Sequence, residues 1–209
     1  MVNPNSNDKP DFYNDLDKII DAVWDLLLIG KNKSKSEFHQ GYISTYSNNY
    51  PSIRTVVLRH VNKSKNTISF HTDIRSKKIE ELKDNGKISM LFYDHGKKIQ
   101  LKISGNAIIN NNNEQSRQAW DQSRSFSKKC YIVEKPPGTK SDNAVSGYAD
   151  EHEHELPSND ILEKGFNNFT LVDIHIASIE WLYLHRDGHR RAFFTFDSNT
   201  LINKTWLTP

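Results

Sequence analysis

Basic residues gather in one stretch of this chain, residues 54–105, beside apolar runs that have the character of β-strands. Five of them are Arg54, Arg59, Arg75, Lys77 and Lys78. Arg offers a planar fork of N–H donors and Lys a compact point charge, and both bind phosphate oxygens well. Positive charge held on a rigid sheet therefore suits a phosphorylated, planar ligand.

Lys77 and Lys78 fall in the first turn of a helix that we expect over residues 76–85, with Ser76 as N-cap and Gly86 at its end. The helix dipole disfavours cations at this end by roughly 0.3–1 kcal/mol, whereas it favours a bound anion. A phosphate that offsets the two lysines would explain their position. The alternative interpretation is a solvated helix face, which is what charged runs usually are.

Residues 99–107 alternate apolar and polar side chains with a period of two, the clearest strand signal in the chain. Gln100 lies on the polar face, where its carboxamide could both donate to and accept from the edge of a planar ring ligand. Solvent exposure is the alternative for Gln100. Arg54 and Arg59 begin and end a strand with an apolar middle, and for them the alternative is weak surface ion pairing.

The elements that must position these residues follow from periodicity and turn signals. We expect disorder over residues 1–9 and a long loop over 134–158. Residues 56–58 are consecutive apolar residues, which predicts burial on both faces of their strand. Further helices are expected over 11–29, 113–124 and 159–166, and strands over 38–46, 53–61, 67–72, 87–93, 169–177, 179–185 and 190–196. Short antiparallel strands with few helices favour a small barrel, in one domain spanning residues 1–209.

Composition narrows the classes of function. The net charge of +2 argues against a bulk nucleic-acid binder, which is usually far more basic. Cys130 is the single cysteine, so the chain cannot build an internal disulfide or a Cys-based zinc site. The polar N-terminal segment and the absence of a long apolar run predict a soluble, cytoplasmic protein without membrane contact.

One further segment, Glu151-His152-Glu153-His154-Glu155, alternates groups that can bind metal ions. On a strand these side chains would split between two faces, and on a loop they would be solvated. Because a metal site needs ligands that converge and a fixed surrounding shell, we expect no metal here.

Ordered motifs in the chain resemble those of the pyridoxamine 5'-phosphate oxidase family of flavin-binding split barrels. The similarity covers residues 54–124 and 168–209 and rests on RTVVLR (54–59), FHTDIRSKK (70–78), IQLKISG (99–105), IEWL (179–182), GHRRAFF (188–194) and the terminal WLTP. The resemblance implies a mainly β, α+β fold: an antiparallel six-stranded split β-barrel with flanking helices. It also implies a homodimer with FMN at each subunit interface.

The resemblance assigns FMN to particular positions. The residues that match the family's flavin-contacting segments are Arg54, Thr55, Val56, Val57, Leu58, Arg59, His71, Thr72, Lys77, Lys78, Gln100, Trp181 and Arg191. His71 and Thr72 occupy the place of an aromatic–Thr pair. We find no clear equivalent of the family's Gln-Ser flavin pair within the loop 134–158.

By the same matching, the substrate would contact Arg59, Trp120, Arg124, Lys128, Asp187 and His189. The family's substrate-phosphate site uses Lys, Tyr, Arg and Ser, so positive charge is kept here and the Tyr hydroxyl is lost. His189 and Arg124 are the candidate catalytic groups. Asp187 stands where the oxidases of the family place an Arg, and an anion there would repel an anionic substrate.

These observations predict an FMN-dependent oxidoreductase that resembles pyridoxamine 5'-phosphate oxidase and oxidises a small amine- or phosphate-bearing substrate. A C–H next to an amine or alcohol would deliver hydride to the flavin, which supplies the redox chemistry. The alternative from another class is a non-catalytic flavin- or haem-binding module for storage or sensing, and a third is a ligand-free interaction domain. The sequence names neither the substrate nor the electron acceptor.

Overall fold

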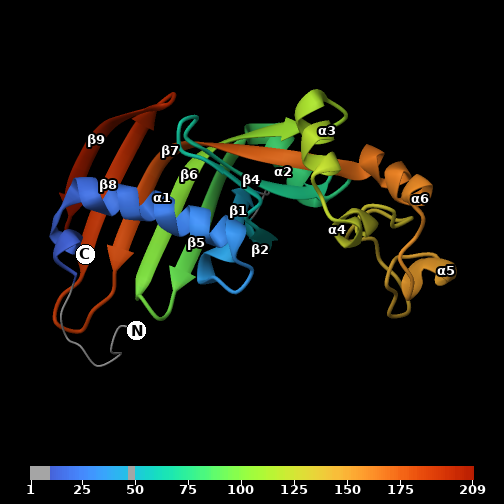
Figure 1. Ribbon diagram of the computed structural model, residues 1–209, viewed down its shortest axis with the longest axis horizontal. Helices are drawn as coiled ribbons and strands as arrows, with labels where there is room; N and C mark the ends of the chain where they lie inside the picture. The colour runs from blue at the N-terminus through green and yellow to red at the C-terminus, as the bar shows by residue number, and fades with distance from the viewer. Residues whose placement is uncertain (1–9, 47–49) are drawn as a thin grey trace.

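The computed structural model describes residues 10–46 and 50–209, so the expected disorder of residues 1–9 lies outside the described residues. Its dominant feature is one antiparallel sheet (Figure 1). Nine strands make up this sheet in the described residues: β1 Gln40–Tyr46, β2 Pro51–Val57, β3 His60–Asn62, β4 Thr67–Asp73, β5 Lys87–Asp94, β6 Ile99–Asn110, β7 Phe169–Tyr183, β8 Arg190–Asp197 and β9 Thr200–Leu207.

The sheet curls until its two ends meet. Its strand order is β2-β1-β5-β6-β7-β4-β3, with β8 and β9 continuing beyond β7. The backbone N–H of Leu58 donates to the carbonyl of His39, at 2.9 Å, and that of Arg59 to the carbonyl of Ser69, at 2.8 Å. The chain between β2 and β3 thus joins both ends of the sheet, and β2 and β3 together act as one of six barrel strands. This confirms the predicted split barrel.

Three strand expectations differ from the structure. The strand expected over 53–61 is interrupted at residues 58–59, the two expected over 169–185 form the single strand β7, and β9 was not expected. Burial on both faces of residues 56–58 is also wrong for Val57, which is only half-buried. β2 is the last strand of its sheet and has a neighbour on one side only.

The two faces of the sheet have different residues because side chains alternate along each strand. One row across five strands, Ile43, Met90, Ile103, Ile179 and Phe194, is buried in the core. The neighbouring row points to the other face, the outer face, and runs through Tyr42, Leu91, Lys102, Glu180 and Phe193. The charged residues Lys102 and Glu180 of this row therefore lie on the outer face.

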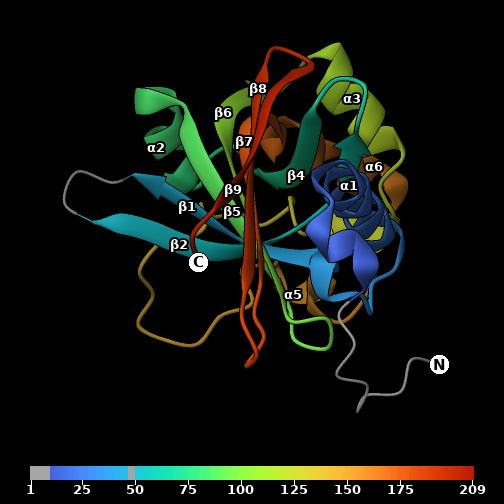
Figure 2. The same cartoon turned by 90° about the vertical axis from the view of Figure 1, so that its left-hand side faces the viewer.

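The helices cover what the strands leave open: η1 Asp11–Asn14, α1 Leu16–Asn32, η2 Glu37–His39, α2 Lys77–Asn85, α3 Glu114–Asp121, α4 Ser125–Lys129, α5 Asp150–Glu153, α6 Asn159–Lys164 and η3 Gly165–Asn168. α1 lies across the strands and buries its apolar stripe in the core, while α3 to α6 gather at the end of the sheet where β7 begins (Figure 1). Figure 2 shows α1 and α2 on opposite sides of the central strands. The expected loop 134–158 contains only the short α5.

Among the described residues, no helix is long and apolar enough to cross a membrane.

Candidate functional site

Residues of β2, β4 and α2 form a polar group at the start of α2, which we call the β4–α2 cluster: Arg54, Thr72, Ser76, Lys77 and Lys78. The Lys78 ammonium donates to the Thr72 hydroxyl, with Nζ and Oγ1 at 2.9 Å. Ser76 stands at the expected N-cap position, but its hydroxyl donates to the Asp73 carbonyl at 2.7 Å and does not cap the helix. The first turn of α2 therefore keeps amide groups that no N-cap side chain satisfies, next to two lysines.

Arg54 reaches the same cluster from the edge strand. Its guanidinium donates to the Glu81 carboxylate, with Nη2 and Oε2 at 2.8 Å, and also contacts Thr45 and Ser52. Glu81 is buried on α2; burial alone would raise its pKa, but hydrogen bonds from Thr45 and Arg54 hold it below the usual value. The pKa of Lys78 is lowered, first by burial and then by the charge of Arg54. The cluster thus holds positive charge that the protein does not fully neutralise.

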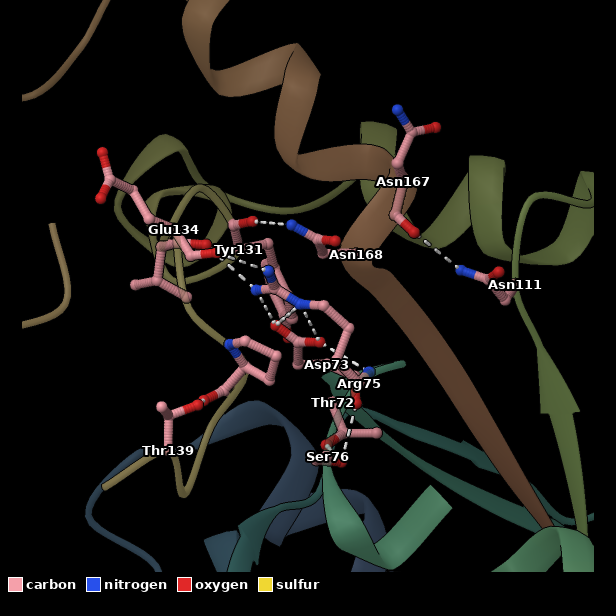
Figure 3. Close-up of polar contacts among 12 residues, drawn as sticks. Thr72, Asp73, Arg75, Ser76, Asn111, Tyr131, Glu134, Thr139, Asn167 and Asn168 are labelled. Carbon is pink, nitrogen blue, oxygen red and sulfur yellow. Dashed lines mark hydrogen bonds and ion pairs between the residues drawn. The ribbon is translucent and has the colours of Figure 1, made fainter. Parts of the chain in front are cut away.

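Arg75, the remaining cation of the basic stretch, has a structural role (Figure 3). Its guanidinium pairs with the Asp73 carboxylate, with Nη2 and Oδ2 at 2.7 Å. It also donates to the backbone carbonyls of Val133 and Glu134, at 3.1 and 3.2 Å. Arg75 therefore fastens the segment after α4 to the turn between β4 and α2, and its charge is matched by Asp73.

A second group lies on the outer face of the sheet. Gln100 is half-buried on β6, directly opposite Leu182 on β7, and Leu182 is in turn opposite Arg191 on β8. The Arg191 guanidinium pairs with the buried Glu180 carboxylate at 3.0 Å, yet its Nε has no partner among the described residues. The Gln100 side chain also makes no hydrogen bond with any residue that the structure describes. The Gln100 carboxamide is therefore free to bond a ligand or another chain, whereas the unpartnered Arg191 Nε is buried.

Trp181 does not belong to this group, contrary to the expectation from the family motif. It is opposite Leu101 in the register, whereas Leu182 is the residue opposite Gln100. Because successive strand residues point to opposite faces, the indole enters the core, where it is 2% exposed and packs edge-on against Tyr13. Leu182 occupies the outer-face position that Trp181 was expected to fill.

His71 and Thr72 point to opposite sides of β4, because they are consecutive strand residues. Thr72 points to the β4–α2 cluster, whereas His71 points away from it. His71 lies beside His60, with their Nε2 atoms 3.3 Å apart, and packs edge-on against Phe169. Burial, followed by the charges of His60 and Arg59, lowers the pKa of His71 to about 3.

His71, Arg59 and Arg124 come together in a cleft of about 400 Å³ between α1, β3, β4 and α3. Two other residues assigned to the substrate site do not line it. Trp120 is 0% exposed, and its indole N–H donates to the Glu163 carboxylate at 2.9 Å. Lys128 places its ammonium over the Trp120 ring, 5.3 Å from the centroid. The structure thus gives Trp120 a place in a small second core and corrects its assignment to substrate binding.

His189 and Asp187 belong to the hairpin between β7 and β8. The His189 ring accepts a hydrogen bond from the backbone N–H of His185, with N and Nδ1 at 3.0 Å. The hairpin follows the last residue of β7, while the first residue, Phe169, packs on Trp120 near Arg124. A strand of 15 residues spans roughly 45 Å. His189 and Arg124 therefore lie near opposite ends of strand β7 within one molecule.

Sequence reasoning missed the buried carboxylates Glu81 and Glu180, which hold Arg54 and Arg191 in place. The burial of Glu81 could have been predicted from its spacing on α2, because position 81 falls between the apolar positions 79 and 82 of the buried face. Lys31 and His60, which also line the cleft, gave no signal, since they come from separate elements.

Comparison with known proteins agrees with this arrangement. A family model described as pyridoxamine 5'-phosphate oxidase, FMN-binding domain, matches residues 21–111, from α1 through β6. Over these residues the chain is similar to the FMN-binding domains of this family. An Arabidopsis thaliana relative named pyridoxine/pyridoxamine 5'-phosphate oxidase 2 is 32% identical over 126 residues; the match spans 55% of this chain and 64% of the relative.

Two solved structures share the fold of this chain. A pyridoxamine 5'-phosphate oxidase-related, FMN-binding protein from Nostoc punctiforme superposes with a TM-score of 0.68 at 16% identity, covering 90% of this chain and 96% of the other. PhzG from Burkholderia lata, in complex with tetrahydrophenazine-1-carboxylic acid, also gives 0.68, at 18% identity, covering 97% and 98%. At such identities the likeness establishes the shared architecture alone.

Proposed function

We propose that this protein is an FMN-dependent oxidoreductase that oxidises a small amine- or phosphate-bearing substrate. The observation that carries the proposal is the charge of the β4–α2 cluster. Arg54, Lys77 and Lys78 contribute three positive charges and Glu81 one negative charge, a surplus of two. A phosphate monoester carries about −1.5 to −2 near pH 7, so the FMN phosphate would balance this surplus.

The donors of the cluster also suit a phosphate chemically. The Lys78 ammonium has a neutral hydroxyl, that of Thr72, as its hydrogen-bond acceptor. The open first turn of α2 adds backbone N–H groups, which favour an anion. On the outer face of the sheet, Gln100 and Arg191 offer a carboxamide and a guanidinium to the flavin ring. Bound FMN would accept hydride from the substrate, while the protein binds and orients both.

We further propose that the working unit is a homodimer with FMN at the subunit interface. The cofactor residues fall into two groups, the β4–α2 cluster and the outer face around Gln100, which no hydrogen bond or ion pair joins in the described residues. Arg124 and His189 likewise lie near opposite ends of strand β7. A second copy could bring its hairpin to the first copy's cleft, so that one site takes Arg124 from one chain and His189 from the other.

The kind of substrate is inferred from relatives and from charge. The Arabidopsis relative is named for phosphorylated vitamin B6 compounds, and the Burkholderia structure holds a ring with a carboxylic acid. Both ligands are ring compounds with an acidic group. Arg59 and Arg124 line the cleft here and would attract such a group. Pyridoxamine 5'-phosphate is therefore the first compound to test.

The decisive experiment is the visible spectrum of the purified protein, followed by titration with FMN and anaerobic addition of pyridoxamine 5'-phosphate. A flavin spectrum that is bleached by the substrate supports the proposal. No chromophore, together with no binding of added FMN, refutes it. Mixing inactive Arg124→Gln and His189→Gln variants then tests the shared site, since a mixed dimer restores one intact site. Mixed protein without activity refutes the division between chains.

Asp187 favours a second candidate, a non-catalytic flavin- or haem-binding module. Its carboxylate lies in the hairpin beside His189, with Oδ2 3.5 Å from His185 Nδ1, where an oxidase of the family would present a cation to an anionic substrate. This candidate expects a bound chromophore that no small amine or phosphorylated metabolite reduces. A haem spectrum would also favour it.

A further inference from the structure

Three charged side chains, Lys102, Glu180 and Arg191, share the outer face of the sheet around Gln100. They belong to three adjacent rows that cross β5, β6, β7 and β8, and every other residue of these rows is neutral. The rows are Tyr93, Gln100, Leu182 and Arg191; Leu91, Lys102, Glu180 and Phe193; and Ser89, Ser104, Ser178 and Thr195. The electric field at this part of the outer face is therefore set mainly by two cations and one anion.

The anion, Glu180, lies between the two cations. Its Oε1 is 3.0 Å from Arg191 Nη2, and its Oε2 is 3.1 Å from Lys102 Nζ. The Glu180 side chain is buried, and burial alone would raise its pKa; hydrogen bonds from Arg191 and Lys102 hold the pKa below the ordinary value. Glu180 is therefore ionised at neutral pH, and its charge largely cancels that of Arg191.

A flavin ring on this face would change its charge during the proposed reaction. Accepting hydride adds two electrons and one proton to the ring, which thereby gains one negative charge. The substrate loses that hydride from a C–H bond and releases an N–H or O–H proton to water, and so becomes an imine or a carbonyl compound. Positive charge near the ring favours the reduced form, whereas negative charge favours the oxidised form.

Resting on the proposed function, we propose that Glu180 is a positioning residue that sets the reduction potential of bound FMN, because its carboxylate holds the Arg191 guanidinium and cancels its charge beside the ring. A second buried pair of the same kind, Glu81 and Arg54 at 2.8 Å, lies in the β4–α2 cluster. Reduction of the ring leaves the charge of the FMN phosphate unchanged. Glu81 should therefore affect the affinity for both redox forms equally, whereas Glu180 should affect the difference between them.

The test measures the midpoint potential of the FMN-loaded protein at equilibrium with a reference dye, without oxygen, as dithionite is added. Glu180→Gln keeps the shape of the side chain and an oxygen acceptor for Arg191, and it removes the charge. The variant should prefer reduced over oxidised FMN about tenfold more strongly than the wild type does, which raises the potential by roughly 30 mV for a two-electron couple. Lys102→Met should lower the potential by a smaller amount, because the Lys102 side chain is 45% exposed and water screens its charge.

Glu81→Gln is the matched control, since it also removes a buried carboxylate from an arginine, and it should leave the potential unchanged. If Glu180 had only a structural role, its loss would weaken the binding of both redox forms alike and the potential would not move. That result, or a lower potential in Glu180→Gln, overturns the proposal. If Glu180→Gln does not fold, Lys102→Met carries the test, and a potential that is unchanged or higher in this variant overturns the proposal.

The same measurements separate this proposal from the proposed function. Wild-type protein that binds no FMN refutes both. Bound FMN whose potential shifts as expected, but which no small amine or phosphorylated compound reduces, refutes the oxidoreductase and supports the role of Glu180. Bound FMN that a substrate reduces, with the same potential in the wild type and in Glu180→Gln, supports the oxidoreductase and refutes the role of Glu180.

Discussion

Lys78→Met should have opposite effects on the stability of the free protein and on its affinity for FMN. The Lys78 ammonium is partly buried, donates to the neutral Thr72 hydroxyl at 2.9 Å and lies near the Arg54 guanidinium. Its pKa is lowered, which means that the folded protein disfavours its charge. Met keeps the aliphatic stem and removes the charge, and the Thr72 hydroxyl retains Ser76 as a partner at 3.4 Å.

Without FMN, the variant should be more stable than the wild type by about 0.5 kcal/mol, a figure reduced for solvent screening. With FMN, a charge-assisted hydrogen bond to the phosphate is lost, which costs about 2 kcal/mol, or roughly 30-fold in Kd. The unfolded Lys78 binds its proton up to the ordinary value of 10.5. The stability gain of the variant should therefore shrink as the pH approaches that value, since the wild-type protein is relieved as Lys78 loses its proton.

Urea unfolding of the apoprotein and fluorescence titration of FMN measure the two effects separately. Lys83→Met is the matched control, because Lys83 is exposed in the last turn of the same helix. The reasoning is refuted if Lys78→Met leaves the Kd for FMN within twofold of the wild type, or if it destabilises the apoprotein by more than Lys83→Met does.

Three further predictions concern the scaffold. Trp120→Phe removes the indole N–H that Glu163 accepts and part of a fully buried ring, so unfolding free energy should fall by about 1–3 kcal/mol while FMN affinity stays unchanged. Glu180 is buried between the cations Lys102 and Arg191. Burial tends to raise the pKa of Glu180, but hydrogen bonds from these two cations lower it below 4.5. Glu180→Gln should therefore lower the free energy of unfolding by about 1–2 kcal/mol near pH 7. That difference should vanish in unfolding curves measured below the folded pKa, where the wild-type carboxylate is protonated as well; a constant difference would contradict the account. Gly105→Ala places a Cβ 2.2 Å from the His175 carbonyl at the irregular step between β6 and β7, so a loss of about 2–4 kcal/mol is expected in thermal unfolding, and a neutral variant would contradict it.

Local patterns were enough to predict most of the elements and the family of the fold. The period of two over residues 99–107 located β6, and apolar spacing with Gly86 located α2, whose C-cap is left-handed as glycine permits. Helix and strand signals are short-ranged, so they are present in the sequence itself. β9 was not predicted, because Thr200–Leu207 is largely exposed and polar residues interrupt its apolar pattern.

The site was predictable to the extent that its residues are close in sequence. Lys77, Lys78 and Thr72 came from one motif, and the structure places Lys78 and Thr72 in contact. Trp181 was misplaced because a motif read one residue out of register moves a side chain to the other face of a strand.

The sequence by itself determined which chemistry is available: an excess of Arg and Lys beside buried strands, and the helix start that favours an anion. Only the tertiary structure decided which charges are already neutralised, because Glu81 and Glu180 reach Arg54 and Arg191 from other elements. It also decided that Lys31, Arg59 and Arg124 have no ion-pair partner among residues 10–46 and 50–209 and share one cleft with the His60–His71 pair. Such distinctions depend on distances between residues far apart in the chain, which the closure of the barrel fixes and local sequence does not.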